Sequence, residues 1–168
     1  MSTYTIPVFE SSLSELDIDY RRTDTPGFVD ILHDVIEEPA VGTPLEGYDV
    51  SLENTRVDLD PTPRQLRNAA VGVTPIERAI AEYGSLVVES NTAGNEPVSL
   101  YPPTHVGVVR ESDIIPDVES ATTYLSNRFT AGKSAVFATG VSSTGDMGAL
   151  VEGVHGPKTV HVILLTDQ

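Results

Sequence analysis

The sequence contains no cysteine among its 168 residues. This absence excludes disulfides, thiolate zinc sites and cysteine-ligated iron–sulfur clusters within the chain. No apolar run approaches the roughly 18 residues that a membrane-spanning helix needs. The opening segment, MSTYTIPVFE, lacks the basic region and apolar core of a signal peptide. These absences predict a cytoplasmic protein that is not inserted in a membrane.

Lysine is almost absent, since only Lys133 and Lys158 stand beside eight arginines, against 25 acidic residues and a net charge of −15. Nucleic acids and anionic membranes would be repelled by such a surface and are not expected as partners. The acids form either a surface for a basic partner or a solvation coat for a very salty cytoplasm, where screening shortens their repulsion to a few ångströms. Their dispersion and the scarcity of lysine favour the second interpretation and an extreme halophile. We therefore expect the fold to lose stability below about 1 M salt.

Apolar strands alternate with helices along most of the chain, which predicts an α/β fold: a Rossmann-like, mostly parallel sheet with helices on both faces. We expect one domain over residues 1–168, with a core at 61–168 and a less clearly patterned part at 1–60. The expected helices are 9–16, 61–70, 74–84, 117–129 and 146–152, and one more that Thr25-Pro26 opens and Pro39 ends. The expected strands are 17–22, 71–73, 85–89, 98–101, 105–110, 134–139 and 160–165, with short strands or loop at 40–60.

The loop at 140–146 is the strongest candidate for a binding site, because ligands of open α/β sheets bind at the carboxyl ends of strands. Gly140 and Gly145 allow a close approach of the backbone. Free N–H groups and three hydroxyls could hold a phosphate or carboxylate; the hydroxyls are those of Ser142, Ser143 and Thr144. The alternative interpretation is a turn whose Ser, Thr and Asp146 side chains cap the next helix.

Two histidines are further candidates. His155 lies between Gly153 and Gly156, so a tight turn could expose its imidazole as an acid, a base or an anion ligand. His105 begins a strand and could reach a site at that strand's end. A structural role is the alternative for both. The four histidines of the chain show no metal-ligand spacing, so no metal site is expected.

Glu82 is a candidate carboxylate near the turn between a helix and a strand. Gly84 suits a left-handed helix end, and Ser85 begins the next strand. Glu82 could act as a nucleophile or base, or be an exposed acid at the end of a helix.

Three segments resemble, in order across residues 71–165, the lactate-utilisation (LUD) domain family, especially its small C-type (LutC-like) members. They are IAEYGS at 80–85, LYPPTHVGVV at 100–109, and TGVSSTGDMGALVEGVHGPKTVHVILL from 139. The third matches a family pattern of Gly-Pro-Ser-x-Thr-Ala-Asp followed by Gly-Val-His-Gly-Pro. The matching residues are Gly140, Ser142, Thr144, Asp146, Gly153, His155, Gly156 and Pro157. Departures stand at Tyr83, Val141, Gly145 and Met147-Gly148, close to the expected site.

The resemblance implies a fold similar to the NagB/RpiA/CoA-transferase group and a link to the oxidation of L-lactate to pyruvate. It implies a non-redox accessory subunit without a cofactor of its own, whose partners are iron–sulfur subunits and a small anionic ligand. The ligand is expected at the 140–146 loop, with Asp146 orienting the loop. The residues expected nearby are His155, Gly156, Gly84, Ser85 and His105.

Two alternatives remain open within the resemblance. One is an enzyme of the CoA-transferase or cyclo-ligase type that uses Glu82 as nucleophile, because Glu82-Tyr83-Gly84 resembles a Glu-x-Gly nucleophile context. The other is a regulatory protein that senses lactate, although the lack of a basic surface argues against direct DNA contact.

Overall fold

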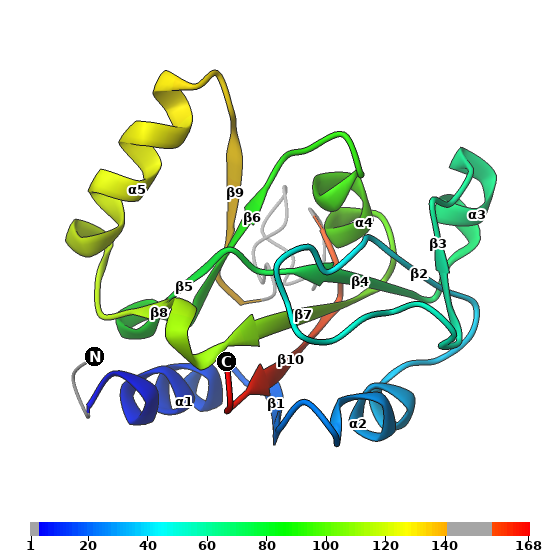
Figure 1. Ribbon diagram of the computed structural model, residues 1–168, viewed down its shortest axis with the longest axis horizontal. Helices are drawn as coiled ribbons and strands as arrows, with labels where there is room; N and C mark the ends of the chain where they lie inside the picture. Colours follow the sequence, from blue (N-terminus) through cyan, green and yellow to red (C-terminus); the bar gives the residue numbers. More distant parts are fainter. Residues whose placement is uncertain (1–3, 141–155) are drawn as a thin grey trace, which may run out of the picture.

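A six-stranded sheet lies at the centre of the computed structural model, which describes residues 4–140 and 156–168 (Figure 1). Every strand pair in this sheet is parallel, as the sequence predicts. From edge to edge its strands are β1 (Asp19–Thr23), β10 (Thr159–Leu165), β7 (Thr104–Arg110), β4 (Val71–Pro75), β2 (Ala40–Gly42) and β3 (Val57–Leu59). The C-terminal strand β10 is thus inserted between β1 and β7.

Helices pack on both faces of the sheet, which confirms that expectation. The helices are α1 (Thr5–Glu15), α2 (Phe28–Val35), α3 (Pro63–Asn68), α4 (Asn95–Leu100) and α5 (Val118–Thr130). Because side chains alternate along a strand, β10 contributes to two cores. Ile163 and Leu165 pack with α2 on one face, whereas Val162 and Leu164 pack with α1 on the other.

A second, four-stranded sheet covers part of the α1 face. Its strand order is β8 (Ile114–Ile115), β5 (Arg78–Ile80), β6 (Ser85–Glu89) and β9 (Ala135–Ala138). The two sheets touch at Gly107, where an added Cβ would lie 3.0 Å from Ile76 and 3.1 Å from Leu86. Helix α5 packs through Ala121 on the other side of this small sheet and stands away from the main sheet in Figure 1.

The helix expected at 74–84 is wrong. Residues 71–75 form β4, 78–80 form β5, and only a short 3-10 turn, Ala81–Tyr83, separates β5 from β6. Thr74-Pro75-Ile76-Glu77 carries the sequence of a helix start, but Ile76 is fully buried between the sheets. The Glu77 N–H donates to the carbonyl oxygen of Val87 at 3.3 Å instead of entering a helical turn. Pairing with β6 therefore outweighs the local helix signal.

The strand expected at 98–101 is also wrong, because these residues belong to helix α4 and the turn after it. Helix α4 lies directly on the main sheet, where an added Cβ at Gly72 would come within 2.0 Å of the Val98 carbonyl oxygen. The strand expected at 134–139 is present as β9, but it pairs antiparallel with β6 in the small sheet. The segment that follows β9 therefore does not extend from a strand of the parallel sheet.

Within residues 4–140 and 156–168, no helix is both long and apolar enough to cross a membrane. The same residues contain no group of three His, Cys, Asp or Glu side chains placed to hold a metal ion.

Candidate functional site

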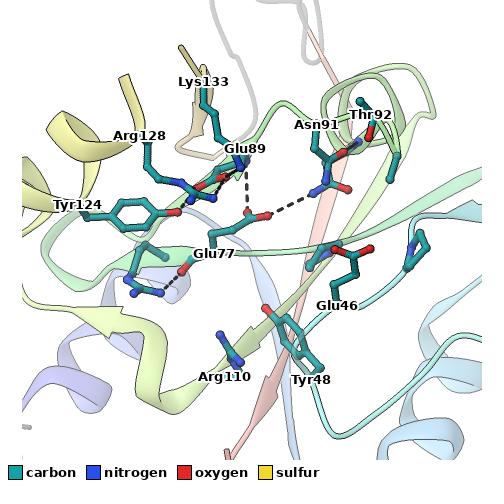
Figure 2. Close-up of a pocket in the computed structure, with 15 residues that line it drawn as sticks. Glu46, Tyr48, Glu77, Glu89, Asn91, Thr92, Arg110, Tyr124, Arg128 and Lys133 are labelled. Carbon is teal, nitrogen blue, oxygen red and sulfur yellow. Dashed lines mark hydrogen bonds and ion pairs between the residues drawn. The ribbon is translucent and has the colours of Figure 1, made fainter. Parts of the chain in front are cut away.

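A cleft of about 470 Å³ opens where three strands of the parallel sheet end (Figure 2). Pro44 follows β2, Pro75 ends β4 and Arg110 ends β7. The wall opposite them comes from β6, α5 and the segments around them. The polar side chains that line the cleft are Glu46, Tyr48, Glu77, Arg78, Glu89, Asn91, Thr92, Asn95, Arg110, Tyr124, Arg128 and Lys133.

The position of the cleft follows from the order of the strands. From β2 the chain runs outward to the edge strand β3, whereas from β4 it continues in the opposite direction to β7. The carboxyl ends of β2 and β4 therefore flank the point where the direction of winding reverses. Open α/β sheets bind their ligands in the crevice at such a point.

Glu89, at the end of β6, is the most enclosed carboxylate of the cleft, with only 3% of its surface exposed. Its oxygens accept hydrogen bonds from the Arg128 guanidinium and the Tyr124 hydroxyl, and the Lys133 ammonium lies 3.9 Å away. Burial alone would oppose ionisation, but the hydrogen bonds from Arg128 and Tyr124 outweigh it and lower the pKa of Glu89. Glu89 is therefore an anion at neutral pH, held by cations from α5 and the segment after it.

Glu77 lies beside Glu89 on the floor of the cleft but is held by neutral donors. The Asn95 side-chain amide donates to Glu77 Oε1 at 3.2 Å, and the Glu89 backbone N–H donates to Oε2 at 3.3 Å. Burial is the main reason that the pKa of Glu77 rises to about 7. The pKa values of the two neighbouring carboxyl groups are thus shifted in opposite directions, an arrangement typical of sites that exchange protons.

Two arginines are fixed at the sides of the cleft by the same buried acid. Asp113, 5% exposed, accepts hydrogen bonds from both Arg78 and Arg110. The Arg78 guanidinium lies 4.7 Å from the centre of the Tyr124 ring, and that of Arg110 lies 4.5 Å from the centre of the Tyr48 ring. These contacts hold the guanidinium groups in place before any ligand arrives.

The Tyr48 ring is itself anchored to the sheet. Its hydroxyl lies 2.8 Å from the Ile76 carbonyl oxygen and 3.0 Å from that of Val108. Burial raises the pKa of Tyr48 well above its usual value, so its hydroxyl stays protonated. Together with the preceding observations, this means that the cleft combines the fixed guanidinium groups of Arg78 and Arg110 with the carboxyl group of Glu77, which can exchange a proton near neutral pH.

The family model described as "LUD domain" matches residues 8–165. The chain belongs to the LUD domain family. The "Lactate utilization protein C" of Geobacillus thermodenitrificans (strain NG80-2) is 30% identical to this LUD domain over 155 residues, 86% of this chain and 61% of that protein. The "Lactate utilization protein C" of Bacillus subtilis (strain 168) is 30% identical over 135 residues, 77% of this chain and 54% of that protein. This LUD domain thus spans about three fifths of the length of these relatives or less.

The LUD domain is similar to a solved structure, that of a DUF162 family protein from Deinococcus radiodurans. The two chains superimpose with a TM-score of 0.75 over 96% of each, at 20% sequence identity. This similarity shows that they share a fold.

Five of the ten residues expected to bind a ligand lie outside the described part of the LUD domain. They are Ser142, Ser143, Thr144, Asp146 and His155. The predictions for these residues, and for a short helix at 146–152, therefore stay predictions.

The structure brings His105 and Gly140 together at a second cavity of about 350 Å³, which Pro157 also lines. His105 is 1% exposed at the amino end of β7, and its Nε2 lies 2.9 Å from the Thr74 hydroxyl. Burial lowers the pKa of His105 to about 4, so its imidazole is neutral at neutral pH. Gly156 adopts a positive φ of 104° just before Pro157.

Glu82 and Gly84 lie near α1, and neither they nor Ser85 line the cleft. Glu82 is exposed in the 3-10 turn, and its backbone N–H donates to the Pro116 carbonyl oxygen at 3.0 Å. Gly84 adopts the left-handed conformation that the sequence predicts. The Ser85 hydroxyl lies 2.6 Å from that of Thr139, immediately before Gly140.

The sequence-based reasoning missed the residues that line the cleft. Glu77 looked like part of a helix start, and Glu89 was the end of an apolar strand. A carboxylate that closes an otherwise apolar segment, SLVVE, is a signal that could have been used, because a buried acid needs a cation or several donors.

Proposed function

We propose that this LUD domain is an accessory, non-redox component of a lactate-utilisation system and that its cleft binds a small organic acid. The names of its curated relatives support the link to lactate utilisation. Because the chain spans only part of those relatives, the activity and partners of the whole proteins are part of the proposal. Iron–sulfur subunits are the redox partners we propose.

The observation that carries the proposal is the concentration of cations at one cleft. Four of the ten lysine and arginine residues line it, although the net charge of the chain is −15. They are Arg78, Arg110, Arg128 and Lys133. The lining also includes Glu46, Glu77 and Glu89, so the attraction for an organic anion comes from the cations that face the cleft and not from a lining of one sign. The volume, about 470 Å³, lies within the range of small-ligand sites, roughly 300–1,000 Å³.

Lys133 is the cation best placed to turn towards a ligand. Arg78 and Arg110 are bound to Asp113, and Arg128 is bound to Glu89. The Lys133 ammonium lies 3.9 Å from Glu89, and 45% of its side chain is exposed. A carboxylate ligand could therefore reach Lys133 without breaking a short ion pair.

The test compares the only two lysines of the chain. L-Lactate and pyruvate are added to the wild type, Lys133→Gln and Lys158→Gln, and melting temperatures are measured at one fixed salt concentration. Lys158 is exposed next to the first residue of β10, at the end of the sheet opposite the cleft, and serves as the matched control. We expect the acids to raise the melting temperature of the wild type and Lys158→Gln, and much less that of Lys133→Gln.

Other results would contradict the proposal. An absence of any shift with either acid would refute binding of these acids by the chain. Equal shifts in both lysine variants would refute the cleft as the place of binding. A shift with CoA or a folate, and with neither acid, would favour an enzyme of the CoA-transferase or cyclo-ligase type.

A further inference from the structure

Like the exposed Glu46, and unlike the other charged groups of the cleft, Glu77 has no ion partner among the described residues. Each of its carboxyl oxygens meets one neutral donor, the Asn95 amide or the Glu89 backbone N–H. Asn95 is 1% exposed, and its Oδ1 has no hydrogen-bond partner within the described part of the chain. The floor of the cleft therefore contains a buried acceptor, Asn95 Oδ1, that no described donor satisfies, so its hydrogen bonding can accommodate one more proton.

Two of the four cations of the cleft, Arg128 and Lys133, lie together next to Glu89, whereas Arg110 lies on the other side of Glu77. Figure 2 shows Lys133 and Arg128 next to Glu89, with Glu77 below them and Asn91 and Thr92 across the cleft. In the binding mode proposed below, the carboxylate of the organic acid meets Lys133 and the oxygen on its second carbon faces Glu77. That oxygen is the polar group that differs between a 2-hydroxy acid and a 2-oxo acid.

We infer, on the basis of the function proposed above, that Glu77 determines whether the cleft can hold the 2-oxo form of the organic acid as well as the 2-hydroxy form. As a carboxylic acid, Glu77 donates a hydrogen bond to the keto oxygen of a 2-oxo acid. As a carboxylate, it accepts a hydrogen bond from the hydroxyl of a 2-hydroxy acid.

The chemical reason is that a keto oxygen can only accept a hydrogen bond, whereas a hydroxyl can donate or accept. An ionised Glu77 facing a keto oxygen would bring two acceptors together with no proton between them. The 2-oxo acid therefore binds only when Glu77 carries a proton. The 2-hydroxy acid binds in either state.

Glu77 is the group of the cleft that changes state near neutral pH, because burial raises its pKa to about 7. Glu89 stays ionised, since its pKa is lowered by Arg128 and Tyr124. The pKa values of Tyr48 and Tyr124 are raised mainly by burial, so both remain neutral. The other charged groups that line the cleft are the exposed carboxylate of Glu46, Arg78, Arg110, Arg128 and Lys133.

The experiment measures the dissociation constants of pyruvate and L-lactate by calorimetry between about pH 5.5 and about pH 8.5. We expect the affinity for pyruvate to fall about thirtyfold between the acid limit and about pH 8.5, because only the protonated fraction of Glu77 binds it. The affinity for L-lactate is expected to change by less than about threefold. Repeating the titration in buffers of different ionisation enthalpy should reveal proton uptake with pyruvate alone.

The decisive variant is Glu77→Gln, whose amide offers a donor at every pH. Its affinity for pyruvate should be independent of pH and close to that of the wild type at low pH. Glu53→Gln, at an exposed position outside the cleft, is the matched control and should keep the pH dependence of the wild type.

The outcomes separate the two proposals. If both acids bind but their affinities change in parallel with pH, or Glu77→Gln keeps the pH dependence, the role of Glu77 is refuted and the proposed function stands. If neither acid binds at any pH, the proposed function itself fails.

Discussion

Replacing Glu77 with glutamine should stabilise the protein, and the gain should grow as the pH rises. The pKa of Glu77 rises from 4.5 to about 7 in the folded chain, mainly through burial. Between these two values the folded state binds more protons than the unfolded state. The Glu77 contribution to the free energy of unfolding therefore falls as the pH rises from about 4.5 to about 7.

The size of the effect follows from the shift. One pKa unit corresponds to about 1.4 kcal/mol, so ionised Glu77 costs the folded state about 3 kcal/mol above pH 7. The same relation gives less than about 1 kcal/mol at about pH 5. Glu77→Gln removes this cost. The difference in the free energy of unfolding between Glu77→Gln and the wild type should therefore grow by about 2.5 kcal/mol from about pH 5 to above pH 7. For a chain of this size that is roughly 5–10 °C in melting temperature.

The assay is urea denaturation of the wild type, Glu77→Gln and the exposed control Glu53→Gln at several pH values. His105, whose pKa is lowered to about 4 by burial, makes every variant less stable as the pH falls below about 6.5. Because this contribution is common to all three, it cancels in the differences. A difference between Glu77→Gln and the wild type that stays constant with pH would refute the reasoning.

Further predictions concern the packing around the cleft and the charge of the chain. Arg128→Ala should cost about 2–3 kcal/mol in urea denaturation, because Glu89, which is 3% exposed in the wild type, would lose its main ion partner. This range already allows for the 36% exposure of the Arg128 side chain, which weakens the ion pair by solvent screening. A loss below about 0.5 kcal/mol would contradict this. Gly72→Ala should cost about 3 kcal/mol or more, since the new Cβ would lie 2.0 Å from the Val98 carbonyl oxygen; a melting temperature like that of the wild type would show that α4 can move. The net charge of −15 predicts that the melting temperature rises with added salt up to about 1 M, and a flat curve would argue against a halophilic surface.

Local patterns were enough to predict the parallel sheet and most of its helices. The apolar run VHVILL located β10, and helical spacing located α2 and α5. In these segments the side-chain pattern and the observed packing agree, because each element buries one continuous face or is buried on both sides.

The errors occur where tertiary pairing opposes a local signal. Residues 74–77 satisfy the rules for a helix start, but Ile76 fills the contact between two sheets, which no local rule can anticipate. The strand at 135–138 was found, but not its sheet, because strand patterns do not reveal which partner a strand will pair with.

The cleft could not be predicted for a related reason. Glu77, Glu89, Arg110 and Arg128 come from four different parts of the chain, and only the folded structure brings them together. The opposite protonation tendencies of Glu77 and Glu89 depend on which donors reach each of them. That information lies in the packing of α5 and α4 against β6, and not in the identity of the two residues as glutamates.

The place of β10 has a consequence for how the protein is made. Strand β1 hydrogen-bonds to β10 along its length, from Asp19 opposite His161 to Thr23 opposite Leu165. The Asp167 carboxylate then accepts from the Thr25 N–H at 2.9 Å. On the ribosome, β1 emerges long before the strand beside which it must lie. Strand β1 therefore stays without this partner until β10 has been made, and such non-local pairing makes folding slow and exposes nascent chains to aggregation.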